Sequence, residues 1–154
     1  MTLMRDPNAD RRAQTRDADA LREARHCFVC GQDNPIGLHV HFRLVADVCV
    51  AEFTPGPTHV GYAGLIHGGI VFSLLDDVMA NCLWLRGERG VTARCEIRYR
   101  ASIPVGTPLR LEGRIAARRQ RLIETVGVVT DAARSAVYAA ATAQFMLDAA
   151  APRR

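Results

Sequence analysis

The chain has 154 residues and 49% of them are hydrophobic, which is enough for one domain with a buried core. Its formal net charge is +4, arginine is its basic residue throughout with no lysine, and no basic run exceeds two residues. This weak charge without interleaved aromatic residues does not predict a nucleic-acid partner, and it is compatible with an anionic small ligand.

The N-terminal segment is polar. Residues 1–25 alternate arginine and aspartate with few large hydrophobic residues, so we expect a flexible lead-in without a secretory signal. The longest mainly hydrophobic stretch, Ile70 to Leu75, is too short to cross a bilayer. The odd number of cysteines, five, favours a reducing compartment. The sequence therefore predicts a cytoplasmic protein that does not enter a membrane.

The hydrophobic pattern predicts two strands, one helix and four further strands. Alternating residues indicate strands at about 38–45 and 48–54, joined as a hairpin. A glycine-punctuated loop and a long helix ending at Leu85 to Gly87 follow. Alternation then predicts a long strand from Val91 that places Thr92 on its solvent face. The last strands are expected at about 109–118, 122–130 and 135–147.

The predicted helix is hydrophobic on nearly every side and yet carries two adjacent carboxylates, Asp76 and Asp77. Such a helix is expected to be buried on every side. Buried carboxylates are costly unless they are paired or have a chemical task. Because no second helix is available to cover it, an antiparallel sheet of about six strands curved around the helix is the expected α+β fold. The open sheet edge predicts pairing of two chains.

Two motifs resemble those of a known family. The segment HVGYAGLIHGG at 59–69, followed by Leu75 and Asp76, resembles the hotdog-fold acyl-CoA thioesterases, most closely the phenylacetate-pathway type. The segment CFVCGQDNPIGL at 27–38 resembles the N-terminal signature of a subset of that family. The resemblance covers residues 26–148 and leaves 149–154 as a loose tail. It implies hydrolysis of an acyl-CoA without a cofactor by a homodimer or a dimer of dimers.

The resemblance and the chemistry of a helix start assign roles to four residues. The free N–H groups of Gly68 or Gly69 are expected to bind the thioester oxyanion. Asp76, nine residues after His67, matches the family's catalytic acid and would act as general base or nucleophile, with a pKa raised by burial. His67 either contacts the substrate carbonyl or caps local backbone.

The helical spacing gives a further prediction. The nine residues from His67 to Asp76 rise about 13–14 Å along a helix, so Gly68, at the helix start, and Asp76 of one chain cannot both touch the same thioester. Two antiparallel helices from different chains could bring these groups together. A catalytic motif of this kind therefore predicts an active site shared between subunits.

Other polar residues are secondary candidates for substrate binding. Relatives often carry Asn or Gln at the position of Gly61, so His59 or a water would replace that group, unless this subset manages without it. Asp77 is expected in a structural network with Ser73 and Asn81, although Ser73 could equally serve Asp76. Arginine side chains suit the phosphates of CoA, with an ordinary solvated role as the competing interpretation. The arginine candidates are Arg98, Arg100, Arg118, Arg119 and Arg121.

Several interpretations stay open at this point. Cys27 and Cys30 could bind zinc with help from a histidine (His26, His39 or His41), but one such pair is too few for a structural site, so a tight turn containing two thiols and no metal is expected. A redox pair lacks the required strand-to-helix context. The acyl pocket could involve hydrophobic helix residues that are equally explained as core: Val78, Met79, Leu83 and Trp84. The alternative functions are a non-catalytic acyl-CoA-binding module and a hotdog hydratase or dehydratase.

Overall fold

The computed structural model describes residues 24–149. Most of the expected N-terminal lead-in and almost all of the expected C-terminal tail therefore lie outside the described residues. The chain divides into two compact units, with the boundary between His39 and Val40, and each unit is considered by itself.

The described part of the first unit, residues 24–39, is built from tight turns. A Cβ atom added at Gly31 would lie 2.4 Å from the Cys27 backbone nitrogen, so only glycine fits there. The Cys27 sulfur accepts a hydrogen bond from the Val29 N–H at 3.4 Å. The Asn34 amide donates to the His26 carbonyl at 3.1 Å and accepts from a backbone N–H two residues on. The motif at 27–38 thus specifies a compact turn.

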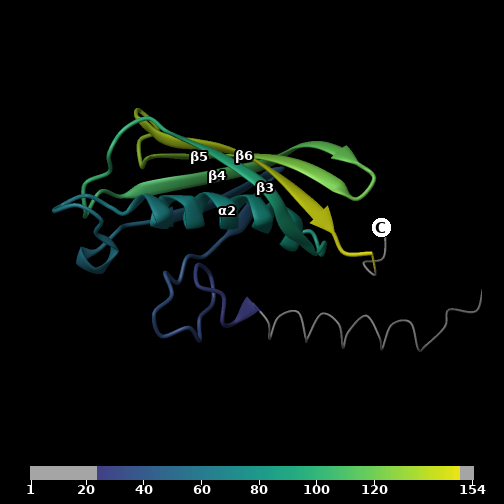
Figure 1. The fold of residues 1–154 in the computed structure, drawn as a ribbon, viewed down its shortest axis with the longest axis horizontal. Helices are drawn as coiled ribbons and strands as arrows, with labels where there is room; N and C mark the ends of the chain where they lie inside the picture. Colours follow the sequence, from purple (N-terminus) through teal and green to yellow (C-terminus); the bar gives the residue numbers. More distant parts are fainter. Residues whose placement is uncertain (1–23, 150–154) are drawn as a thin grey trace, which may run out of the picture. The chain divides into compact units, whose positions relative to one another are not determined.

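The second unit is a six-stranded antiparallel sheet with one long helix against one face (Figure 1). The strand order is β1-β2-β4-β5-β6-β3. The helix is α2, Gly68–Trp84, and a short 3-10 helix, η1, precedes it at Pro57–His59. The predicted curved sheet around one long helix is confirmed. The strands are β1 (Arg43–Val45), β2 (Val48–Phe53), β3 (Gly90–Tyr99), β4 (Leu109–Arg119), β5 (Leu122–Asp131) and β6 (Val137–Leu147).

Two predicted strands differ from the structure. The first strand was expected from residue 38, but β1 begins at Arg43, because His39 has a φ of 53° that interrupts an extended backbone. The second difference is a bulge in β3 at Ala93: Thr92 pairs with Phe145 of β6, and the next paired residue of β3 is Arg94. The extra residue shifts the alternation by one. The prediction that Thr92 shares a face with the arginines of β3 is therefore wrong: Thr92 lies on the helix-facing side, although it remains exposed.

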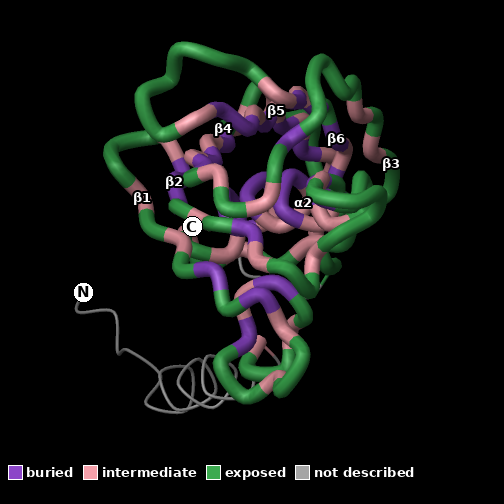
Figure 2. The backbone as a smooth tube through the Cα atoms, turned by 90° about the vertical axis from the view of Figure 1, so that its left-hand side faces the viewer, coloured by how far each residue is buried: buried purple, intermediate pink, exposed green. Residues whose placement is uncertain are grey.

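Helix α2 lies unusually close to the sheet at two facing glycines. Gly113 of β4 and Gly127 of β5 pair directly across the ladder. A Cβ atom at Gly113 would lie 2.7 Å from the Val78 carbonyl oxygen of the helix, and one at Gly127 would lie 3.0 Å from Cγ of Met79. Buried positions gather along this contact (Figure 2). Val78, Met79 and Leu83 are at most 1% exposed, so they form core against the sheet and do not line an open pocket.

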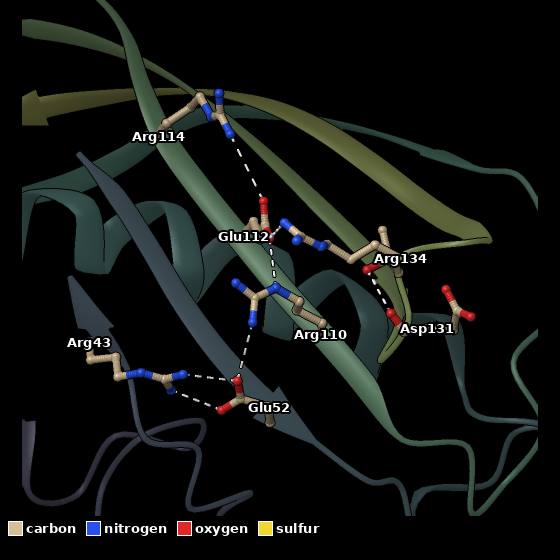
Figure 3. A network of polar contacts seen from close by, with 8 residues as sticks. Arg43, Glu52, Arg110, Glu112, Arg114, Asp131 and Arg134 are labelled. Carbon is tan, nitrogen blue, oxygen red and sulfur yellow. Dashed lines mark hydrogen bonds and ion pairs between the residues drawn. The ribbon is translucent and has the colours of Figure 1, made fainter. Parts of the chain in front are cut away.

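The opposite face of the sheet is covered by charges (Figure 3). Glu52 of β2 accepts two hydrogen bonds from Arg43 of β1, at 2.9 and 3.0 Å, and it also pairs with Arg110 of β4. Arg110 in turn donates to Glu112 at 2.6 Å. Because Arg110 and Glu112 alternate with the buried Leu109 and Leu111, they point away from α2. This network of arginine and glutamate side chains therefore lies on the other side of the sheet from the polar residues of α2.

We predict that Gly113→Ala destabilises the protein by about 1–3 kcal/mol, because the new methyl group meets backbone that cannot move aside. Gly127→Ala should cost less, since the neighbouring Met79 side chain is flexible. Gly56→Ala is the matched control, because nothing lies within 4 Å of a Cβ atom there. Denaturant unfolding of the three variants gives the comparison. Equal effects at Gly113 and Gly56 would contradict the close helix contact.

Candidate active site

The loop before α2 is fixed at both ends. Its two sides form an antiparallel bridge between Val60 and Ile66, and Leu65 bridges to Pro104. The Ile66 N–H also donates to the Ile103 carbonyl at 2.9 Å. These backbone bonds hold the loop before the helix as a defined structure, so the helix start is presented in one orientation.

His67 is the N-cap of α2. Its Nδ1 atom accepts the Gly69 N–H at 2.9 Å, so the local backbone-capping interpretation of this residue is present in the structure. The Gly69 donor is thereby occupied. The Gly68 N–H has no acceptor within residues 24–149. Of the two glycines proposed for the oxyanion site, Gly68 is therefore the one that offers a free N–H.

Tyr99 lies beside the same helix start. Its hydroxyl donates to the Gly68 carbonyl at 2.7 Å, and a Cβ atom at Gly68 would contact the Tyr99 ring at 3.5–3.6 Å. The side chain remains 51% exposed at the open edge of the sheet. Sequence reasoning assigned Tyr99 no role, because nothing in the alternation reveals a contact with a residue 31 positions away.

Asp76 is half-buried two turns further along the helix. One carboxylate oxygen accepts a hydrogen bond from the Thr92 hydroxyl at 2.9 Å. Burial raises the pKa of Asp76, and the Thr92 hydrogen bond opposes that rise. Sequence reasoning missed Thr92 because the bulge at Ala93, which turns it toward the helix, leaves no signal in a strictly alternating pattern. The direction of the pKa shift is the one expected from burial of this carboxylate.

Cys95 completes the polar strip on the helix-facing side of β3. Burial, and then the charge of Asp76, raise the pKa of its thiol, so it stays protonated at neutral pH. Along β3 the strip therefore begins with Thr92 and Cys95 near Asp76 and ends with Tyr99 at Gly68. Asp76 and Gly68 lie at opposite ends, since eight residues of helix separate them by about 12 Å.

The other helix candidates have local partners. The Asn81 amide donates to the Asp77 carboxylate at 3.2 Å, so the Asn81 part of the predicted network is present. The expected bond between Ser73 and either aspartate is not found among the described contacts. Ser73 instead donates to the Gly69 carbonyl at 2.9 Å, as serine in a helix often does.

His59 and Gly61 shape the loop. The Nδ1 atom of His59 accepts the Gly56 N–H at 2.9 Å, and its ring packs against Phe53 with centroids 5.3 Å apart. A Cβ atom at Gly61 would lie 3.0 Å from Cα and 3.2 Å from Cδ2 of His67. The Asn or Gln that relatives often carry here would press on His67, which gives a steric reason for glycine.

The five arginine candidates separate into two groups. Arg118 makes two hydrogen bonds to Glu88 at 2.7 and 2.6 Å, Arg121 donates to the Leu147 carbonyl, and Arg119 lies 3.8 Å from Glu124. Arg98 of β3 and Arg100, directly after β3, have no side-chain partner within residues 24–149. Arg98 pairs with Ala140 of β6, between the buried Ala139 and Ala141, so its side chain points to the face of the sheet away from α2.

None of the five cysteines forms a disulfide. Among the described residues, no helix is long and hydrophobic enough to cross a membrane.

Comparisons with known proteins identify one superfamily. A family model described as the thioesterase superfamily matches residues 63–138. The mouse acyl-coenzyme A thioesterase THEM5 is 27% identical over 116 residues, which cover 75% of this chain and 46% of that protein. The chain thus spans about half the length of this curated relative.

Solved structures share the fold. The thioesterase superfamily protein RHA08564 superposes with a TM-score of 0.74 at 25% identity, over 94% of this chain and 81% of that chain. A hypothetical thioesterase with coenzyme A from Streptococcus pneumoniae TIGR4 has a TM-score of 0.66 at 19% identity, over 71% and 85% of the two chains. The resemblance to the hotdog-fold thioesterases that the sequence indicates is confirmed.

We predict that Asp76→Asn raises the melting temperature at neutral pH. Because the folded-state pKa of Asp76 is raised, its ionised form destabilises the fold above that pKa, and the amide removes the charge. The gain should disappear as the pH falls through the folded-state pKa. Thermal unfolding at several pH values measures it.

Asp131→Asn is the control of opposite sign. Hydrogen bonds from the Ala136 N–H and from Ser135 lower the pKa of Asp131, so its ionised form stabilises the fold and its loss should lower the melting temperature at neutral pH. A neutral-pH loss for Asp76→Asn as well would show that the Asp76 charge is not destabilising.

Proposed function

We propose, from its membership of the hotdog-fold thioesterase superfamily, that this chain hydrolyses acyl-CoA thioesters to a free acid and CoA. One observation carries the proposal: a half-buried carboxylate, Asp76, is held by the Thr92 hydroxyl on a helix whose start presents a free N–H at Gly68. A carboxylate of raised pKa and an unoccupied backbone donor are the two groups that thioester hydrolysis requires.

The chemistry assigns each group a step. The Gly68 N–H binds the carbonyl oxygen and stabilises the negative charge that develops on it. Asp76 either removes a proton from a water that attacks the carbonyl carbon, or attacks that carbon itself to give an anhydride that water then opens. In both routes the carbon–sulfur bond breaks and the CoA thiolate leaves and takes up a proton. Thr92 orients the carboxylate.

The site requires two chains. Strand β3 forms one edge of the sheet, and it is ten residues long. An unpaired edge of this length favours pairing with another chain. Antiparallel pairing of two β3 strands across a twofold axis would bring the Asp76 end of one chain beside the Gly68 end of the other. This arrangement resolves the separation of the two groups within one chain, and it supports a homodimer or a dimer of dimers.

Two arginines favour CoA as the carrier. Arg98 and Arg100 flank Tyr99 at the end of β3 that lies nearest Gly68, and their guanidinium groups suit the phosphates of CoA. CoA is present in the S. pneumoniae hypothetical thioesterase that shares the fold. The more specific assignment to the phenylacetate-pathway type remains a prediction. The absence of disulfides among the five cysteines fits the cytoplasmic location proposed for this chain.

We predict that the wild type releases free thiol from a panel of acyl-CoA substrates and that Asp76→Asn lowers kcat by about 10²–10⁴-fold, since it removes the base or nucleophile. Asp131→Asn, at the end of β5, should retain turnover. Thiol release measured across acyl chain lengths tests both statements. CoA binding without turnover by the wild type would instead favour the non-catalytic binding module, and unchanged turnover in Asp76→Asn would remove Asp76 from the mechanism.

The Thr92 hydrogen bond predicts a pH effect. Because this bond lowers the pKa of Asp76, Thr92→Val leaves the effect of burial unopposed and the pKa rises further. Activity requires the ionised carboxylate, so the acidic limb of kcat/KM should move to higher pH. Thr142→Val, at an exposed position of β6, is the matched control. A limb that stays in place or moves to lower pH in Thr92→Val would contradict the assignment.

A further inference from the structure

One peptide unit at the start of α2 is held from both sides. The carbonyl oxygen of Gly68 accepts the Tyr99 hydroxyl at 2.7 Å. The N–H of Gly69, which belongs to the same peptide unit, donates to Nδ1 of His67 at 2.9 Å. Tyr99, the peptide and His67 therefore form a continuous hydrogen-bond chain. Each bond in such a chain polarises the next, so the Tyr99 hydroxyl strengthens the donor that His67 accepts.

The direction of this chain fixes the state of the imidazole. A nitrogen that accepts an N–H carries no proton, so the neutral His67 ring holds its proton on Nε2. The Nε2 atom has no hydrogen-bond partner among the described residues, and the side chain is exposed. His67 thus presents an exposed N–H donor on the residue that directly precedes Gly68, whose own N–H is free.

The glycines of the motif leave room for this arrangement. A Cβ atom at Gly69 would lie 2.9 Å from Nδ1 and 3.1 Å from Cε1 of His67. A Cβ atom at Gly61 would lie 3.2 Å from the Cδ2 edge of the same ring. A side chain at either position would press on the imidazole, so both glycines are needed for this position of the ring.

Tyr99 is suited to act as a permanent donor in this chain. Burial, and then the nearby Cys95, raise the pKa of its phenol, so the hydroxyl remains protonated at neutral pH. A Cβ atom at Gly68 would lie 3.5–3.6 Å from the phenol, so the Tyr99 side chain lies close beside this residue and its hydroxyl reaches the carbonyl.

We propose that Tyr99 is a positioning residue of the thioester site. Through the Gly68–Gly69 peptide it holds His67 as the tautomer that carries its proton on Nε2. The imidazole N–H and the Gly68 N–H then together bind the carbonyl oxygen of an acyl thioester. The binding of an acyl thioester rests on the proposed thioesterase function. The tautomer of His67 rests on the hydrogen-bond chain alone. Two donors stabilise an oxyanion better than one.

Tyr99→Phe tests the proposal because it keeps the ring and removes only the hydroxyl. We expect kcat to fall by about 2–10-fold, the effect of one hydrogen bond, with KM unchanged. In ¹⁵N NMR spectra of histidine-labelled protein, wild-type His67 should show an accepting Nδ1 and a protonated Nε2, and the two shifts should move toward each other in the variant. A purely structural role of Tyr99 would leave the wild-type tautomer pattern in place.

Tyr138→Phe is the matched control, because the hydroxyl of Tyr138 makes no hydrogen bond within the described residues. A protonated Nδ1 in wild-type His67, or a Tyr99→Phe variant with unchanged kcat and unchanged ¹⁵N shifts, would overturn the proposal. Should the wild type hydrolyse no acyl-CoA at all, the thioesterase function itself fails. The ¹⁵N comparison would then still decide whether Tyr99 fixes the imidazole.

Discussion

The contact of helix α2 with the paired glycines Gly113 and Gly127 determines the setting of the helix in the sheet. With no side chain at either position, the Val78 backbone approaches β4 and the Met79 side chain approaches β5. This setting buries one side of α2 completely and leaves Asp76 at the margin, turned toward β3. The position of Asp76, the carboxylate proposed for catalysis, is thus a consequence of backbone packing elsewhere in the core.

Sequence periodicity was sufficient to predict the helix, the number of strands and the conflict between burial and charge at Asp76. It could not supply Thr92 or Tyr99, the two residues that contact the site from β3. A single extra residue at Ala93 reverses the face on which Thr92 lies, and a pattern of period two cannot reveal where a bulge occurs. The Tyr99 contact depends on how the sheet edge passes the helix start, which is a tertiary property.

In the proposed site, the ionised Asp76 carboxylate both destabilises the fold and supplies the base or nucleophile. Burial disfavours the ionised form of Asp76, and one hydroxyl offsets only part of that effect. At the other end of the strip, Gly61 and Gly69 leave space for the His67 ring. The Gly68 N–H there has no acceptor among the described residues. Each end provides half of what thioester hydrolysis needs. The edge strand β3 links the two ends, so in this account association of two chains and catalysis are one requirement.

Co-expression of two inactive variants tests this account most directly. Asp76→Asn removes the carboxylate, and Gly68→Pro removes the backbone donor at a helix position that accepts proline, since His67 before it is already extended at φ −66° and ψ 135°. Half of randomly formed dimers contain one chain of each kind and one intact site, so the mixture should recover about a quarter of wild-type thiol release. Activity no greater than that of the two separate variants would contradict a site shared between chains.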